Sequence, residues 1–120
     1  MSKTKKVTVV ANAFLLTSGI ENLVLELSGM MVDTIFDGTE KRLCNKIISK
    51  KPEYVIIDPD SFPDKLIPLL RELSEEPDII VIGLVSKNTL PNIRSRFSHI
   101  LHKENNKFQL IEELQNIVGH

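Results

Sequence analysis

The stretch YVIIDPDSFPD, residues 54–64, holds the pattern that decides the fold. Its first four residues are apolar or aromatic and favour β structure, so Tyr54–Ile57 is predicted to be a short strand that is buried on both faces. Asp58 follows this strand directly, and a second acid, Asp60, comes two residues later in a polar, proline-containing segment. A carboxylate at the end of a buried strand loses water, so a cation or a hydrogen-bond donor is expected beside it.

Strand-like and helix-like segments alternate along the rest of the chain. Runs of β-favouring residues predict strands at residues 6–10, 31–36, 54–57, 79–85 and 99–102. Apolar residues at helical spacing predict helices at residues 16–27, 43–48, 67–73, 91–97 and 108–118, the fourth of them short. Turn signals, such as Asp37-Gly38, separate the segments.

This alternation predicts the fold class. Strands that are separated by single helices must run parallel, with right-handed crossovers. Five strand–helix units therefore predict an α/β fold, a three-layer flavodoxin-like sandwich with a five-stranded parallel sheet of order 2-1-3-4-5 and helices on both faces. Residues 1–120 are expected to form one domain with a core of its own.

Composition and charge narrow the classes of function. The formal net charge of −1 gives no whole-chain attraction to nucleic acid or to anionic membranes. No apolar run is long enough to cross a bilayer, and the lysine-containing N-terminal segment lacks the apolar core of a secretory signal peptide, so none is expected. The single cysteine, Cys44, excludes an internal disulfide and lies in an apolar helical pattern, so it is expected to be a buried thiol. A cytoplasmic location is expected.

Polar residues follow three of the predicted strands. In a parallel sheet of this order, ligands gather at the carboxyl ends of the strands, where Asn12, Asp58 and Lys103 are expected to meet. Lys103 would supply the cation that offsets the repulsion between Asp58 and Asp60. Two plainer interpretations stay open at this stage: Asp58 as a turn-forming residue, and Lys103 as a solvated lysine.

The order of the elements and three motifs resemble the response-regulator receiver domain, whose fold is CheY-like, over essentially the whole chain. The motifs are VIIDPD at residues 55–60, HILHKE at residues 99–104, and VTVVANAFLLTSGIENLV, which is similar to the start of receivers in LuxR/NarL-type DNA-binding regulators. The resemblance implies two-component signalling. It makes Asp58 the acceptor of a phosphoryl group from a histidine kinase, Lys103 the residue that pairs with that group, and the Asp60 carbonyl a magnesium ligand.

The positions of the metal-binding acids depart from the family's pattern. The family ends its first strand with two acids, and Ala11 and Asn12 occupy those places here. Magnesium requires oxygen ligands, and each unit charge lost at about 4 Å forfeits roughly 4 kcal/mol at an effective dielectric near 20, before hydration is counted. Asn12, Asp58 and Asp60 are therefore expected to bind magnesium weakly, with slow or absent phosphorylation of Asp58.

The positions that transmit the signal depart from the pattern as well. Val85 stands where the family has Thr or Ser, although a one-residue slip brings Ser86 there, and Ile100 replaces an aromatic residue. Glu104 replaces the proline that commonly follows the lysine. An atypical receiver, or pseudo-receiver, is therefore expected, with phosphorylation uncoupled from output. It would act by binding a histidine kinase or another signalling protein, or by dimerising through the side from helix four to helix five.

Other classes of function stay open. A flavodoxin-like small-molecule or nucleotide binder is one, although residues 11–19, ANAFLLTSG, lack an early phosphate-binding turn. A plain interaction domain is another. The histidines and Cys44 have no zinc spacing, so no hydrolytic or other enzyme centre is expected. Direct binding of nucleic acid by this domain is not expected either, since no helix-turn-helix is present. The similarity to DNA-binding regulators implies that the domain is the N-terminal part of a transcriptional regulator.

Overall fold

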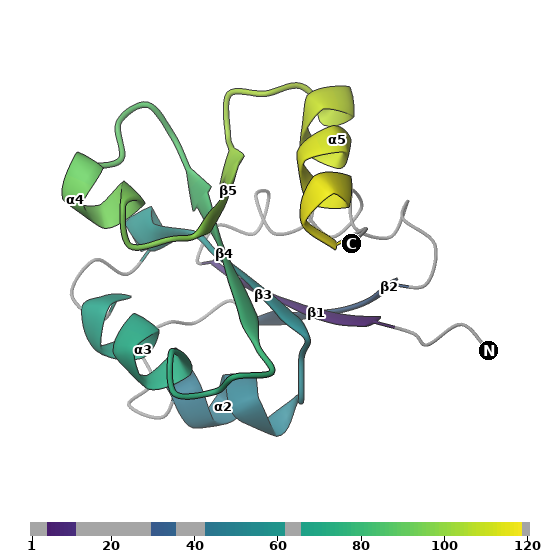
Figure 1. Cartoon of the computed structure of the whole chain (residues 1–120), viewed down its shortest axis with the longest axis vertical. Helices are drawn as coiled ribbons and strands as arrows, with labels where there is room; N and C mark the ends of the chain where they lie inside the picture. Colours follow the sequence, from purple (N-terminus) through teal and green to yellow (C-terminus); the bar gives the residue numbers. More distant parts are fainter. Residues whose placement is uncertain (1–4, 12–29, 36–42, 62–65, 119–120) are drawn as a thin grey trace.

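A computed structural model describes residues 5–11, 30–35, 43–61 and 66–118 (Figure 1). Five strands lie in these ranges: β1 (Lys5–Val10), β2 (Met30–Ile35), β3 (Tyr54–Ile57), β4 (Ile80–Val85) and β5 (His99–His102). They form one parallel sheet of order β2-β1-β3-β4-β5, so the predicted fold class and strand order are confirmed.

Helical segments connect the strands. They are α2 (Leu43–Ser49), the 3-10 turn η1 (Pro59–Ser61), α3 (Leu66–Leu73), α4 (Pro91–Arg94) and α5 (Lys107–Val118). The helix predicted at 16–27 and the turn at Asp37-Gly38 lie outside the described residues. Within the part of the chain that the structure covers, no helix is long and apolar enough to cross a membrane.

Two layers of side chains pack on the two faces of the sheet. On one face, Val9, Ile56 and Leu84 pack with Leu114 and Val118 of α5. On the other face, alternate residues of the same strands pack against α2 and α3 (Figure 1). The side chains in this second layer are Val10, Val55, Ile57 and Val85 from the strands, Leu43, Cys44 and Ile47 from α2, and Leu66, Leu69 and Leu73 from α3. The period of two along each strand therefore fills both layers, as expected of a strand that is buried on both faces.

The register of the strands places two polar residues at one edge of the sheet. Val10 pairs with Ile57, and the next donor in this ladder is the backbone N–H of Asp58, which lies 3.0 Å from the carbonyl oxygen of Val10. Similarly, the backbone N–H of Lys103 donates to the carbonyl oxygen of Val85 at 2.8 Å. Both residues are thus fixed by the sheet itself at its carboxyl edge.

Helix α4 is shorter than residues 91–97, and this difference has a packing reason. The helix ends at Arg94, and Phe97 leaves it so that its ring lies on β4. A Cβ atom at Gly83 would be 2.5 Å from Cγ of that ring, so only glycine allows this approach. The ring covers a part of the sheet that a longer helix would otherwise have to cover.

Two apolar residues are less buried than their patterns suggest. Phe108, predicted in the apolar stripe of the last helix, is 81% exposed. It is six residues from the buried Leu114, which places it about 120° round the helix from the packed face. Ile80 starts β4 and is also exposed, although the apolar run at residues 79–85 suggests burial.

Candidate functional site

An ion pair between Asp58 and Lys103 lies at the carboxyl edge of the sheet. Lys103 Nζ is 2.7 Å from Asp58 Oδ1, a distance typical of a strong charge-assisted hydrogen bond. Asp58 is only 5% exposed, while Lys103 keeps part of its side chain in solvent. The two residues that the sequence placed after different strands are therefore in direct contact.

Asp60 adds a second carboxylate to this pair. Its Oδ2 lies 3.2 Å from Lys103 Nζ, and its side chain is about half exposed. Its backbone N–H also donates to Asp58 Oδ1 at 3.2 Å, within the turn η1. Asp58 is therefore a turn-forming residue and an ion-pair partner at once, so both interpretations from the sequence hold for it. Two carboxylates and one ammonium leave a formal charge of −1 on these three side chains.

The charge state of Lys103 follows from its neighbours. Burial lowers the pKa of Lys103, but the hydrogen bonds and negative charges of Asp58 and Asp60 outweigh that effect and raise the pKa above its ordinary value of 10.5. The lysine is thus a permanent cation near neutral pH. It bridges the two acids and reduces their mutual repulsion.

Thr89 is a polar residue of this edge that the sequence analysis missed. It is only 4% exposed, although it lies in the loop between β4 and α4. Its Oγ1 accepts the backbone N–H of Ser86 at 3.0 Å and lies 3.5 Å from Asp60 Oδ2. Polar loops often contain a threonine close to a serine, so the spacing of Ser86 and Thr89 did not indicate that Thr89 belongs to the site. The contact with Asp60 arises only because the loop folds back.

The residues proposed from the sequence as switch positions lie at the end of β4, in the loop that follows it and within β5. Val85 is the last residue of β4 and is fully buried in the α2 and α3 layer. Ser86 follows it, and its Oγ accepts the N–H of Asn88 at 3.1 Å. Ile100 packs, partly buried, against the same layer as Val85. Asn12, the other predicted site residue, lies outside the described residues.

The described donors at this edge do not by themselves make a magnesium site. Magnesium needs near-octahedral coordination by oxygen atoms. Here the carboxylates of Asp58 and Asp60 are both bound by the Lys103 ammonium, and the side chain of the buried Ala11 has no ligand atom. Among the residues with described positions, no three or more His, Cys, Asp and Glu side chains are grouped to hold a metal ion. The two carboxylates also repel a phosphate, which disfavours a flavin-phosphate site here.

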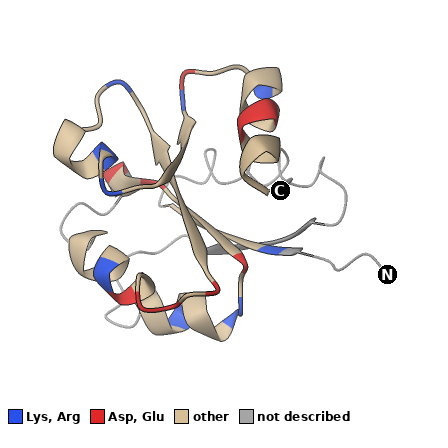
Figure 2. Cartoon of the chain, in the orientation of Figure 1, with Lys and Arg blue, Asp and Glu red and all other residues tan. Residues whose placement is uncertain are grey.

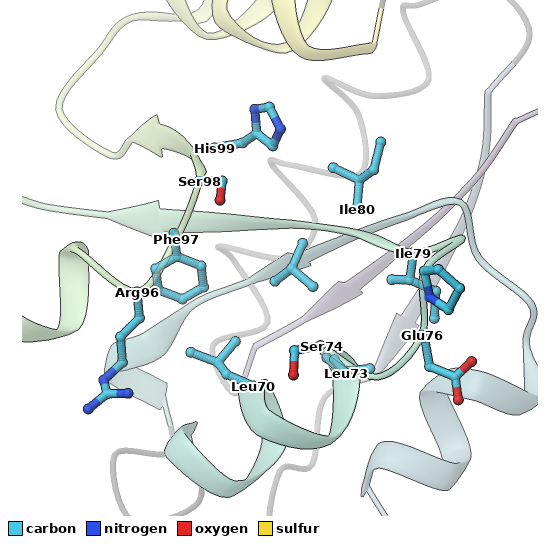
Figure 3. A pocket seen from close by; sticks show the side chains of 12 residues that line it. Leu70, Leu73, Ser74, Glu76, Ile79, Ile80, Arg96, Phe97, Ser98 and His99 are labelled. Carbon is cyan, nitrogen blue, oxygen red and sulfur yellow. The ribbon is translucent and has the colours of Figure 1, made fainter.

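A second polar cluster on the described surface joins Glu113 to its neighbours: Glu113 Oε2 lies 2.6 Å from His102 Nδ1, and Glu113 Oε1 accepts a hydrogen bond from Asn105 Nδ2 at 2.8 Å. Figure 2 shows acidic and basic residues interspersed over the described elements rather than gathered by sign. A pocket of about 370 Å³ lies near the opposite, amino ends of β4 and β5 (Figure 3). Its lining includes Leu70, Leu73, Ile79, Phe97 and His99. It is therefore separate from the ion pair.

Of the comparisons with known proteins, the one with solved structures gives matches, and these concern the fold. Neither the protein-family models nor the curated proteins give a match. Among solved structures, the signal receiver domain of an HD domain-containing protein from Pseudomonas fluorescens has a TM-score of 0.79 and 14% identity, over 98% of this chain and 97% of that one. The isolated REC domain of RcsB from Salmonella enterica, in the presence of a phosphomimetic, has a TM-score of 0.75 and 19% identity, over 96% and 88%.

A response regulator receiver protein from Burkholderia phymatum gives a similar result. Its TM-score is 0.74 with 20% identity, over 96% of this chain and 95% of that one. In each case the match covers nearly the whole of this chain. The chain therefore has the fold of the response-regulator receiver domains that it resembles.

Proposed function

We propose that this domain is an atypical receiver of two-component signalling that acts through contacts with other proteins, while phosphorylation of Asp58 is slow or absent. The observation that carries the proposal is the Lys103 ammonium bound to Asp58 and Asp60 at the carboxyl edge of a receiver-like sheet. The resemblance gives the acid the place of the phosphoacceptor and the amine the place of the phosphate-pairing lysine. The surrounding charges are poorly suited to phosphoryl transfer.

Phosphorylation would need more positive charge than the described residues supply. In the transfer, a carboxylate oxygen of Asp58 would attack phosphorus as the donor's bond to phosphorus breaks, and the leaving group would keep the electron pair. The product is an acyl phosphate with additional negative charge beside Asp60. Among the described residues, Lys103 is the cation paired with these acids, and the side chain of Ala11 offers no metal ligand. Magnesium, which stabilises this charge when bound, is therefore proposed to bind weakly.

Intact-mass spectrometry tests this part of the proposal. The chain is incubated with magnesium and acetyl phosphate, and its mass is followed over time. We expect the unmodified mass to dominate. Prompt, stoichiometric gain of one phosphoryl group that is lost in Asp58→Asn would refute slow phosphorylation. Asp60→Asn is the matched control, since it removes the neighbouring acid and keeps the acceptor.

The contact surface is proposed to lie on the side formed by α4, β5 and α5. Leu90, just before α4, is 62% exposed, and Phe108, in the first turn of α5, is exposed still more. Large apolar side chains in water favour association. A second copy of the chain, a histidine kinase or another signalling protein would cover them. Sedimentation equilibrium of the wild type and of Phe108→Ser tests the first case: a dimer that Phe108→Ser weakens supports it, and a wild-type monomer at all concentrations excludes it.

The setting is proposed to be a regulator of transcription. RcsB, one of the structural neighbours, has been solved bound to a promoter, and a domain with this fold makes up 67% of that chain. Nucleic acid would then be bound by another part of such a regulator. Residues 1–120 would form its receiver-like part.

A further inference from the structure

The loop between β4 and α4 contains a buried hydroxyl group. Among the described residues, the buried polar or charged side chains are Thr8, Asp58 and Thr89. A buried hydroxyl without partners is costly, so its hydrogen bonds define what holds it in place. For Thr89 these bonds point in two directions, towards the loop and towards the acids.

The first direction is the loop itself. Thr89 Oγ1 accepts the backbone N–H of Ser86, and the Ser86 carbonyl oxygen in turn accepts the Thr89 N–H at 3.1 Å. The same Ser86 carbonyl accepts a hydrogen bond from Arg94 Nη2 at 2.6 Å. Arg94 is the last residue of α4. The loop and the helix are therefore joined through one carbonyl group.

The second direction is the acid pair. Because Thr89 Oγ1 accepts from Ser86, its own proton is left for another acceptor, and Asp60 Oδ2 lies 3.5 Å away. Ser86 Oγ is equally distant, but a carboxylate is the stronger acceptor. Asp60 Oδ2 is also the atom that Lys103 binds at 3.2 Å. This one oxygen therefore joins the ion pair to the loop.

We propose that Thr89 is a positioning residue that couples the carboxylate site to α4 through its bonds to Asp60 and Ser86. The inference rests on the proposed function, since it concerns how a change at the carboxylate site alters α4. A change of charge or position at Asp60 would weaken the Thr89 bond and loosen the loop. Arg94 would then lose a fixed carbonyl partner, and α4 would open more often.

Amide hydrogen exchange of the isolated chain tests the coupling. The reporters are the N–H groups of Arg94 and Ser95, which donate to the carbonyls of Leu90 and Pro91. Asp60→Ala is compared in three backgrounds, which carry Thr (the wild type), Val or Ser at position 89. With Thr or Ser, we expect Asp60→Ala to speed exchange of both amides about fivefold, the ratio for a hydrogen bond worth ~1 kcal/mol. With Val, Asp60→Ala should leave their exchange unchanged.

Two results would overturn the inference. One is an equal effect of Asp60→Ala with Val at position 89, and the other is no effect with Thr. Glu104→Ala is the matched control, because Glu104 Oε2 accepts the N–H of Lys87 at 2.8 Å and holds the same loop by a separate bond. Its effect should be the same with Thr or Val at position 89.

Failure of this inference and failure of the proposed function are distinguishable. The exchange measurement uses neither a phosphodonor nor a partner protein. A domain that binds a partner but shows no dependence on Thr89 keeps the function and loses the coupling. If the expected exchange pattern appears but the chain binds no signalling protein, the coupling is supported and the proposed function is not.

Discussion

Replacing Lys103 with methionine tests the energetic role of the ion pair. Methionine keeps the length and most of the apolar stem of lysine and removes the charge. Asp58 would then lose the 2.7 Å bond in a position where only 5% of its surface reaches solvent. Asp60 would lose its own bond to the same ammonium.

The size of the effect follows from burial. Breaking a fully buried pair by removing one partner costs about 3–5 kcal/mol, because the remaining charge is left without compensation. Lys103 is partly exposed and Asp60 is half exposed, so water screens part of this penalty. We therefore expect Lys103→Met to lower the free energy of unfolding by about 2–3 kcal/mol.

Urea denaturation, followed by far-UV circular dichroism, measures this change. Lys87→Met is the control, because Lys87 is an exposed lysine in a neighbouring loop, and its substitution should change stability by less than about 0.5 kcal/mol. Asp58→Asn combined with Lys103→Met should cost less than the sum of the single changes, since both remove the same contact. A loss below about 0.5 kcal/mol for Lys103→Met would show that hydration replaces the pair fully, and the reasoning would be refuted.

Three further outcomes are expected. Folding raises the pKa of Lys103, so the contribution of this lysine to stability is complete below its ordinary pKa of 10.5 and is lost as the pH rises through the higher pKa of the folded state. Unfolding curves between about pH 9 and 12 should show this loss of stability in the wild type and a smaller loss in Lys103→Met. Burial and the neighbouring Glu72 raise the pKa of the Cys44 thiol to about 11, so a thiol reagent near neutral pH should label it slowly until urea unfolds the chain, and rapid labelling of the folded state would contradict this. Gly83→Ala should destabilise the fold by about 1–3 kcal/mol through its clash with the Phe97 ring, and Phe97→Leu should cost less in that background than in the wild type.

The sheet could be predicted from the sequence because its signals are local. Short apolar runs such as Tyr54–Ile57, set between helical patterns, are sufficient to give parallel strands and their order. The contact of Asp58 with Lys103 follows from the same argument, since both residues come directly after strands that end at one edge.

Features that depend on tertiary packing could not be predicted in this way. The role of Thr89 depends on a loop that returns to Asp60, which lies 29 positions earlier in the chain. The early end of α4 depends on the Phe97 ring finding room over Gly83. Phe108 has an apolar side chain that matched a helical pattern in sequence, but its angle around α5 turns it to solvent. In each case a contact distant in the chain, or a direction in space, decides the outcome.

The last hydrogen bonds of the β1–β3 and β4–β5 ladders are donated by Asp58 and Lys103 themselves. The backbones of the two residues are therefore held by the sheet and not only by the surrounding loops. Protein engineers can accordingly rebuild those loops, for example to install a new recognition surface, without dismantling the pair. A shift of one residue in either strand would be the more damaging change, because it would turn one partner to the other face of the sheet.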